Sequence, residues 1–313
     1  MDAEPAVTAG HLEALAQAGF YGIFAPAGEG GLGLSHADAC AAVEELASGC
    51  VASTFLWVQH LRLLNAVLDP STPERWRAQL RRDVVAGRCK GGAVLTGLMP
   101  GPVRLAATRV AGGWRLDGQA PWVSGWGTVD KLYVVARAHE HGLVSLLLEA
   151  HEQPGLEVLP IRLAALNATS TVRLSFRALN VPEERVLGEG RYDEAVQTSE
   201  GLRLNGSFAL GLAKRCCLLF GPSKLDAELA ARREQLDSAG PEEMPAARAA
   251  ACELAVRAAH ALAVERGSRS ALAGDVAERL SREAGVLLVF GSRPAIKSEL
   301  LRRFAGGGPT SPA

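Results

Sequence analysis

Hydrophobic positions follow three different patterns in consecutive blocks of the chain. In the first block apolar residues recur at helical spacing, which predicts helices over 11–19, 35–49, 53–68 and 73–86. From 91 to 188 the pattern changes to short β-type runs separated by Gly- and Pro-containing turns, among them 131–137, 144–149 and 171–177. Beyond 195, Ala, Leu, Glu and Arg dominate and predict long helices over 195–219, 224–239, 245–272 and 275–290.

These blocks predict an α+β protein in three parts. We expect an N-terminal helical domain over 1–90, a central β-barrel domain over 91–190, built as a small antiparallel barrel or sandwich, and a C-terminal helical bundle over 191–304. The apolar faces of the late helices are wide and need partners, either one another or a second subunit. The tail over 305–313 is small and polar, and we expect it to be disordered.

Charge and cysteine content narrow the class of protein. A formal net charge of -1, with basic residues scattered among acidic ones, gives no basic stripe for phosphate-backbone binding, so nucleic acid is not expected as a partner. The six cysteines show no paired Cys-x-x-Cys spacing and are interpreted as reduced core residues, with no metal site. Neither a signal peptide nor a membrane-spanning run is recognised, and we expect a cytoplasmic location.

The glycines at 28, 30 and 33 imitate a dinucleotide-binding fingerprint. In that fingerprint the helix starts within the glycines, whereas here Ser35 and Asp38 resemble a capping box that places the helix start after them. No second strand ending in an acid follows about 20 residues later. The segment is therefore predicted to be a glycine-rich surface loop.

Several short motifs, which occur in a fixed order along the chain, resemble those of the acyl-CoA dehydrogenase family of flavoproteins. Leu95-Thr96 stands where the family has Thr-Glu-Pro, and Trp122-Val123-Ser124 where it has Trp-Ile-Thr or Trp-Ile-Ser. Further matches are the loop over 26–33, the Val-Pro at 181–182, Gly211 midway along a helix, and Arg233, which opens a degraded Arg-x-x-Phe-Gly. The resemblance implies a helical domain, a β-barrel and a four-helix bundle that bind FAD.

The resemblance also assigns roles to residues. Leu95, Thr96, Trp122 and Ser124 would form one wall of the flavin site, and Arg233 would meet the FAD phosphates, usually across a subunit interface. An aromatic body with short hydroxyls at its rim suits a flat ring with a polar edge, and an arginine fork suits a pyrophosphate. The implied partners are an acyl-CoA or acyl-carrier thioester and related subunits, in a homodimer or homotetramer or in a hetero-oligomer.

Each of these residues also has a plainer interpretation. Trp122 could pack the barrel against a helix, Thr96 and Ser124 could bond their own backbone, and Arg233 could be a surface arginine beside Arg232. The order of the phrases favours the flavin site.

A catalytic base is not recognisable. The family takes its glutamate from a Glu-Gly-Thr phrase after the late bundle helices or from the first bundle helix. Here the chain continues from Phe290 without the usual Gly-Gly-x-Gly turn or last helix, and Gly201 occupies the alternative position. Glu200 is the candidate base, although one position along a helix is about 100° of rotation; Glu299 is a second. Gly97 and Leu98 replace the acid and proline of Thr-Glu-Pro.

Three functions remain open. The first is an FAD-dependent oxidoreductase that performs α,β-dehydrogenation of an acyl thioester. The second is a non-catalytic subunit of a hetero-oligomeric acyl-CoA dehydrogenase, and the third is a flavin-dependent monooxygenase of the same fold. We favour the first because the residues of the flavin wall are retained.

Overall fold

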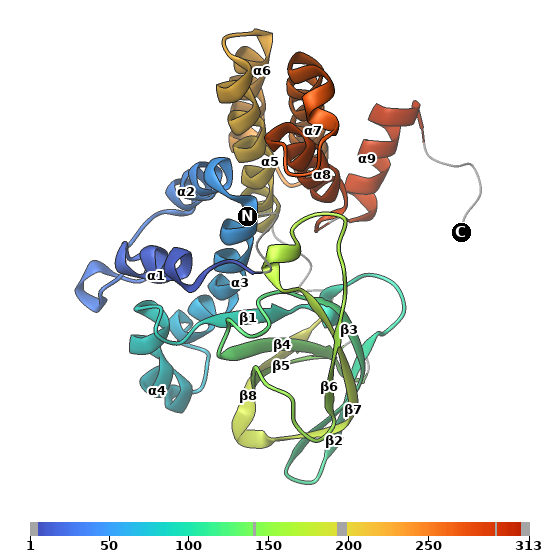
Figure 1. Cartoon of the computed structure of the whole chain (residues 1–313). Coiled ribbons are helices and arrows are strands. Elements are labelled where there is room, and N and C mark those ends of the chain that lie inside the picture. Colours follow the sequence, from blue (N-terminus) through green and yellow to red (C-terminus); the bar gives the residue numbers. More distant parts are fainter. Residues whose placement is uncertain (1–5, 140–141, 193–198, 292, 308–313) are drawn as a thin grey trace.

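A computed structural model describes residues 6–139, 142–192, 199–291 and 293–307. Figure 1 shows helices α1–α4, a curled β-sheet and helices α5–α9 as three successive parts of the chain. The predicted α+β fold class is therefore confirmed. Most of the tail predicted to be disordered, 308–313, lies outside the described residues.

The first four helices follow the predicted ranges closely; they are α1 (Ala9–Gln17), α2 (His36–Gly49), α3 (Val51–Leu68) and α4 (Glu74–Val85). Ser35 caps α2, since its hydroxyl accepts a hydrogen bond from the Asp38 amide at 3.2 Å and donates one to the Asp38 carboxylate at 2.6 Å. The helix therefore starts after the glycines, as their sequence context indicated.

The glycine-rich segment is an exposed loop and is not preceded by a strand. A 3-10 turn covers Phe20–Gly22, and Gly28 and Gly30 are exposed. Gly31 is required for packing, because a Cβ there would lie 2.2 Å from the Ala25 carbonyl oxygen. The prediction of a surface loop is confirmed.

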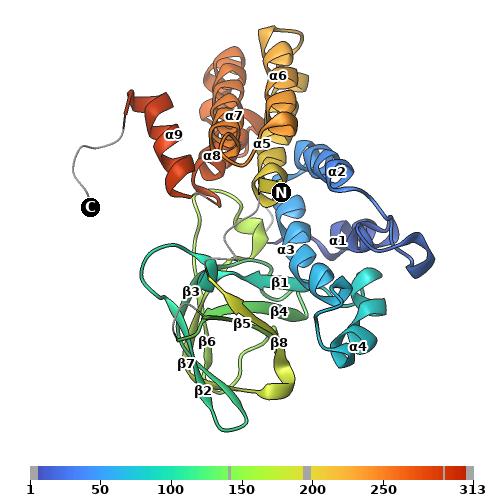
Figure 2. The same ribbon diagram turned by 180° about the vertical axis from the view of Figure 1, so that it is seen from behind.

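Eight strands form the central sheet; they are β1 (Gly91–Val94), β2 (Leu105–Val110), β3 (Gly113–Val123), β4 (Lys131–Arg137), β5 (Gly142–Glu149), β6 (Leu156–Pro160), β7 (Val172–Pro182) and β8 (Val186–Arg191). Their order is β6-β7-β3-β2-β4-β5-β8, and β1 pairs with β4. The sheet curls around its own apolar core, which includes Leu116, Val134 and Leu174. Figure 2 shows the same curl from behind.

The sheet differs from a closed antiparallel barrel in two ways. β1 and β2 pair with β4 in parallel, because the chain between them supplies the crossover that parallel strands need. Within the described residues β6 and β8 do not pair with each other, so the barrel stays open between them. Periodicity gave the strands but not their directions or the closure of the sheet.

The C-terminal part contains α5 (Ser199–Phe220), α6 (Lys224–Ser238), α7 (Met244–Arg266), α8 (Val276–Val289) and α9 (Pro294–Ala305). Helix α9 corrects the expectation that the last helix is missing. It begins with proline in its first turn and buries Ile296 and Leu300, which lie four residues apart on one face, against the bundle. The four-residue spacing of these two apolar side chains indicates a helix, and the sequence interpretation did not recognise it.

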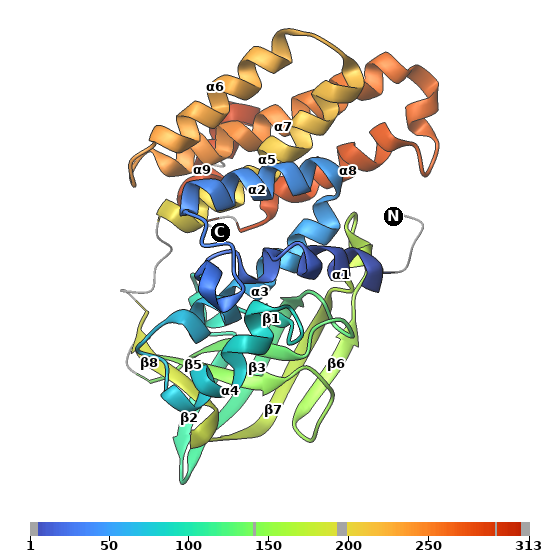
Figure 3. The same cartoon turned by 90° about the vertical axis from the view of Figure 1, so that its left-hand side faces the viewer.

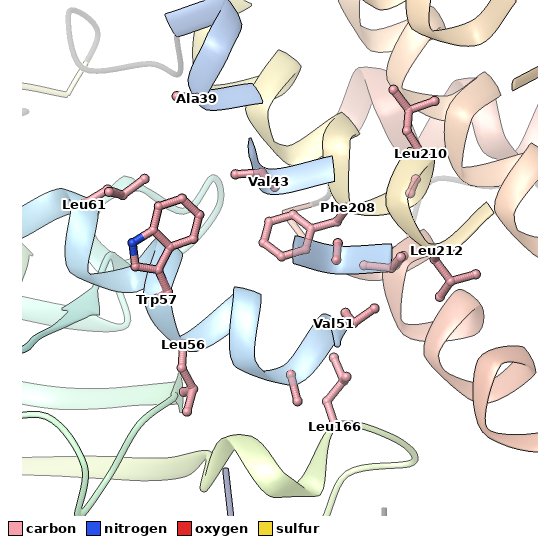
Figure 4. Packing of buried hydrophobic residues seen from close by; sticks show 14 of the residues in the cluster. Ala39, Val43, Val51, Leu56, Trp57, Leu61, Leu166, Phe208, Leu210 and Leu212 are labelled. Atoms are coloured by element: carbon pink, nitrogen blue, oxygen red, sulfur yellow. The ribbon is translucent and has the colours of Figure 1, made fainter. Parts of the chain in front are cut away.

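A single apolar core joins α2 and α3 to the bundle. Figure 4 shows Val43, Trp57 and Phe208 converging from α2, α3 and α5, and all three are fully buried. The Trp57 indole also donates to the Phe20 carbonyl at 2.9 Å. Figure 3 shows α2 lying along the bundle above the sheet. Helix α3 contacts both the bundle, at α5, and the sheet, at β1 and β4.

All six cysteines are free thiols, and Cys40, Cys216, Cys217 and Cys252 are buried. Burial raises the pKa of Cys216 to about 12, which keeps this thiol protonated near neutral pH. The neighbouring thiols 216 and 217 form no disulfide, as the rotation between adjacent helical positions predicts.

His60 connects α3 to the first strand of the sheet. Its Nδ1 accepts a hydrogen bond from the Gly91 amide at 3.0 Å, and the ring is buried. Burial lowers the pKa of His60 to about 3.

This histidine predicts a loss of stability in mild acid. The unfolded chain takes up a proton at this residue below about pH 6.5, whereas the native state does not until about pH 3. The free energy of unfolding is therefore expected to fall by about 2 kcal/mol between pH 7.5 and pH 5 through His60 alone. Urea titrations at both pH values would measure this loss. His60→Gln should remove it, and His260→Gln, which changes an exposed histidine, should not.

Candidate functional site

The residues predicted to form the flavin wall lie at neighbouring strand ends. Thr96 follows β1, Trp122 and Ser124 lie at the end of β3, and these two strands contact each other. A Cβ placed at Gly92 of β1 would be 3.7 Å from the Ser124 carbonyl oxygen. The fold therefore brings two distant parts of the sequence, near 96 and near 122, to the same region of the sheet.

Trp122 presents its ring to solvent. Its neighbours Ala120 and Val123 are fully buried in the core of the sheet, whereas Trp122 is 65% exposed. Single exposed apolar side chains are common on protein surfaces, and the exposure of Trp122 leaves its ring accessible to a ligand. The interpretation that this tryptophan packs the barrel against a helix does not agree with its exposure.

Thr96 is buried, and within the described part of the chain its hydroxyl makes no hydrogen bond. It begins a short 3-10 turn, Thr96–Leu98, that Leu95 precedes. Gly97 packs on β4, since a Cβ there would lie 2.7 Å from the Val135 carbonyl oxygen. Glycine therefore fits the place where the family's acid stands, and a side chain would push the turn off the sheet.

Ser124 belongs to a chain of buried hydroxyls. Its Oγ lies 2.6 Å from that of Thr171, which lies 2.7 Å from the Thr169 hydroxyl, and Thr169 donates to the Leu166 carbonyl at 2.7 Å. Because each hydroxyl has one proton, the direction is fixed: Thr171 donates to Thr169, and Ser124 donates to Thr171. Ser124 is thus left with acceptor capacity only, whereas Thr96 can still donate.

Arg137 positions the turn that carries Thr96, and the sequence interpretation did not identify it. Its guanidinium donates to the carbonyls of Gly97 and Met99, both at 2.9 Å, and lies 3.4 Å from the centre of the Tyr192 ring. An arginine at the end of a β run, alternating with core residues, was the available signal. The contacts of Arg137 with Gly97 and with Tyr192 join residues about 40 and about 55 positions apart, and local spacing in the sequence does not show such contacts.

Arg233 forms an ion pair with Glu44 of the same chain. Its Nε donates to both carboxylate oxygens of Glu44, at 3.0 and 3.2 Å, and its Nη2 donates to one of them. The Glu44 side chain is 5% exposed and that of Arg233 39%. The hydrogen bonds to Glu44 raise the pKa of Arg233. The contact of Arg233 with the FAD phosphates stays a prediction. To bind a phosphate, Arg233 would have to give up some or all of its hydrogen bonds to Glu44.

The described candidates for a catalytic base are few. Glu200 lies in the first turn of α5, and its side chain is outside the described residues, so its role stays a prediction. The Glu299 carboxylate accepts a hydrogen bond from Arg302 at 2.7 Å, which lowers its pKa and makes it a weaker base.

An aromatic cluster occupies the connection between α8 and α9, where the resemblance places a glutamate. Phe290 follows α8 directly, and its ring centre lies 4.8 Å from that of Phe55 and 5.7 Å from that of Phe208. These three rings come from α3, α5 and the end of α8. The described residues of the connection, Phe290, Gly291 and Arg293, include no carboxylate.

The residues at the ends of β1 and β3 have the chemistry that a flavin ring needs. An exposed indole and a hydroxyl that makes no hydrogen bond, at the ends of two strands in contact, suit a flat ring with a polar edge. Ser124 adds an acceptor at the same place. The ring portion of FAD fits the residues present, whereas the arginine assigned to its phosphates is already paired.

Comparison with known proteins agrees with the fold. Residues 1–87 match the family model "Acyl-CoA dehydrogenase, N-terminal domain". Benzylmalonyl-CoA dehydrogenase of Aromatoleum aromaticum is 27% identical over 219 residues, which are 64% of this chain and 55% of that protein. The structure of butyryl-CoA dehydrogenase from Megasphaera elsdenii superposes with a TM-score of 0.82 at 18% identity, covering 96% of this chain and 90% of that one. A glutaryl-CoA dehydrogenase from Mycobacterium smegmatis in complex with FADH2 gives 0.78 at 17% identity, covering 98% and 89%.

A helical part, a curled sheet and a second helical part define the class of fold. The first 87 residues therefore resemble the N-terminal domain of acyl-CoA dehydrogenases, and the whole chain has the fold of these enzymes. It spans about half the length of the curated relatives. In the described ranges no helix has the length and apolar character needed to cross a membrane.

Proposed function

We propose that this chain is an FAD-dependent acyl-CoA dehydrogenase-like oxidoreductase, which removes hydrogen from the α and β carbons of an acyl thioester. The observation that carries the proposal is that the exposed Trp122 and the Thr96 hydroxyl, which makes no hydrogen bond, stand at the ends of two strands that contact each other, β3 and β1, in a chain with the acyl-CoA dehydrogenase fold. The relatives' names differ in acyl group but share the CoA thioester.

Each residue of the candidate site would have a separate role when FAD is bound. When bound, FAD would supply the acceptor for the hydride from the β carbon. Trp122 would cover one face of the ring, Thr96 would donate a hydrogen bond to its edge, and Ser124 would accept one. Arg137 would hold the Thr96 turn in place through the Gly97 and Met99 carbonyls. Glu200 is the proposed base for the α proton.

A second candidate function follows from the aromatic cluster. Phe290 packs between Phe55 and Phe208 where a catalytic carboxylate is expected, which favours a non-catalytic subunit that pairs with a complete one. Homo- and hetero-oligomers are both compatible with this proposal, and a cytoplasmic location stays a prediction that cell fractionation would test.

An anaerobic absorbance titration separates these functions. Purified protein that is yellow and loses its flavin band on adding an acyl-CoA would support the oxidoreductase. Protein that is colourless alone and acquires flavin on mixing with a related subunit would support the second function. An oxygen adduct of reduced flavin would instead indicate the monooxygenase and would contradict both.

Trp122→Ala should weaken FAD binding about tenfold, because the ring would lose an aromatic face worth about 1 kcal/mol beyond its buried area. Since Trp122 is 65% exposed, the change should alter the free energy of unfolding by less than about 0.5 kcal/mol. Equilibrium titration of the apoprotein with FAD gives the affinity. Phe304→Ala removes an aromatic that is 51% exposed on α9 and serves as the matched control. Equal FAD affinity in all three proteins would mean that the indole does not cover the ring.

A further inference from the structure

The loop over 163–171 is bound to the end of β3, where Ser124 lies. The Gly125 amide donates to the Thr169 carbonyl at 2.8 Å, so the backbone of the loop is hydrogen-bonded to the residue that follows Ser124. The loop also carries Thr169 and Thr171, whose hydroxyls continue the buried chain that starts at Ser124. It therefore supports the candidate flavin site through both its backbone and its side chains.

The same loop is fastened to two other parts of the protein. The Val7 amide donates to the Ala168 carbonyl at 2.7 Å, and Arg282 of α8 donates to the Ala164 carbonyl at 2.9 Å. Leu166 has a φ of 64° and packs into the core shared by α3 and the bundle (Figure 4). A leucine keeps this strained left-handed conformation only where the surrounding contacts hold it. The loop is therefore a fixed support for the hydroxyls that it carries.

The direction of the hydroxyl chain is set at the Leu166 carbonyl, which can only accept. Both the hydroxyl and the amide of Thr169 donate to this carbonyl, at 2.7 and 3.0 Å. The Thr169 proton is thereby committed, so Thr171 donates to Thr169 and Ser124 donates to Thr171. All three side chains are buried, and bulk water offers them no other partner. Ser124 therefore presents only lone pairs to a ligand.

A fixed acceptor distinguishes the two redox forms of a flavin. The oxidised ring has unprotonated nitrogens at its edge, and addition of a hydride gives one of them a hydrogen, so that an acceptor becomes a donor. A hydroxyl that can only accept forms a hydrogen bond with the new N–H, whereas it meets the unprotonated nitrogen with a lone pair. Two buried acceptors that face each other weaken binding, because neither has a donor.

We propose that Thr169 and Thr171 are positioning residues that hold Ser124 as an acceptor, so that this site binds reduced FAD more tightly than oxidised FAD. The inference rests on the proposed function, whose flavin site it specifies. Tighter binding of the reduced form raises the reduction potential of the bound FAD. The hydroxyl chain would thus favour transfer of the hydride from the β carbon of the thioester.

Thr169→Val tests the direction of the chain without removing the contact between Ser124 and Thr171. The Leu166 carbonyl keeps the amide of residue 169, whereas the Thr171 hydroxyl loses its acceptor and would donate to Ser124 instead. The Ser124 proton is then free for the ring. Oxidised FAD should bind about fivefold more tightly, the value of one neutral hydrogen bond, and the affinity for reduced FAD should change less than twofold.

The two affinities are measured by titrating the apoprotein with oxidised FAD and, under anaerobic conditions, with dithionite-reduced FAD. A fivefold change in their ratio corresponds to a two-electron potential that is lower by about 20 mV, at about 30 mV for each factor of ten. Ser124→Ala is a second variant, which stays informative if Thr169→Val does not fold. It removes the acceptor and should weaken reduced FAD about fivefold, while the affinity for oxidised FAD changes less than twofold.

Thr128→Val is the matched control. The hydroxyl and the amide of Thr128 donate to the Gly125 carbonyl at 2.8 and 2.9 Å, the same local arrangement as at Thr169, but this hydroxyl is not bonded to Ser124 or Thr171. Both FAD affinities should stay unchanged. Thr171→Ser keeps a hydroxyl in the middle of the chain and should keep the preference for reduced FAD.

Other results would overturn the inference. Equal affinities for the two forms in the unaltered protein would refute it and leave the proposed function standing. Weaker or unchanged binding of oxidised FAD in Thr169→Val would show that this threonine only supports the fold of the loop. An equal gain in Thr128→Val would show that the effect does not pass through the hydroxyl chain. If the unaltered protein bound neither form of FAD, the proposed function itself would be refuted.

Discussion

Gly211→Ala is expected to destabilise the protein by about 3 kcal/mol, the upper part of the range for overpacking a buried site. Gly211 lies midway along α5, where α2 crosses it closely. A Cβ there would lie 2.4 Å from the Glu44 carbonyl oxygen and 2.7 Å from the Ala47 Cβ. Because the first of these atoms belongs to the helix backbone, α2 and α5 would have to separate.

Urea unfolding of Gly211→Ala gives the change in free energy. Gly285→Ala is a matched control, since Gly285 is an exposed helical glycine of α8 and a Cβ there meets nothing within 4 Å. That variant should gain about 0.5 to 1 kcal/mol through helix propensity. A similar gain in Gly211→Ala would show that the two helices are not packed as closely as the structure has them.

Arg233→Met is expected to cost about 3 kcal/mol at neutral pH, because it leaves the Glu44 carboxylate, 5% exposed, without its partner. Glu44→Gln combined with Arg233→Met should recover most of this loss, since no buried charge then remains. Urea unfolding of the two single variants and the double variant measures the coupling as a double-mutant cycle. Additive losses would mean that the ion pair contributes nothing.

The double variant also tests the predicted contact of Arg233 with FAD phosphate. If the arginine serves only Glu44, the stabilised double variant should bind FAD as the unaltered protein does. If it also binds phosphate, FAD affinity should fall about tenfold, the loss expected for one charge-assisted hydrogen bond, even though stability is restored. The two measurements therefore separate a structural role from a binding role.

Local patterns were sufficient for most elements. The cap at Ser35 predicted the start of α2, and the alternation over 131–137 predicted β4 with its observed bounds. Helix α9 was missed because its apolar positions are few and follow Pro294. Caps and alternating hydrophobic positions involve residues only a few positions apart, so they can be recognised in the sequence itself.

The candidate site was only partly predictable. Motif order predicted Thr96 and Trp122 as site residues, and the fold brings their strands β1 and β3 into contact. Arg137 and the hydroxyl chain that uses the Ser124 proton were not, because each depends on a partner far away in the sequence. The same holds for Glu44, whose carboxylate binds Arg233 across 189 positions.

By itself the sequence determined the three-part architecture and the family resemblance, and it predicted the residues proposed for the flavin wall, because periodicity, caps and motif order are local properties. Tertiary structure decided the parallel pairing of β1 with β4, the opening between β6 and β8, and the partners of Arg233 and Ser124. The physical reason is that strand direction, burial and charge pairing depend on which distant segments the folded chain brings into contact.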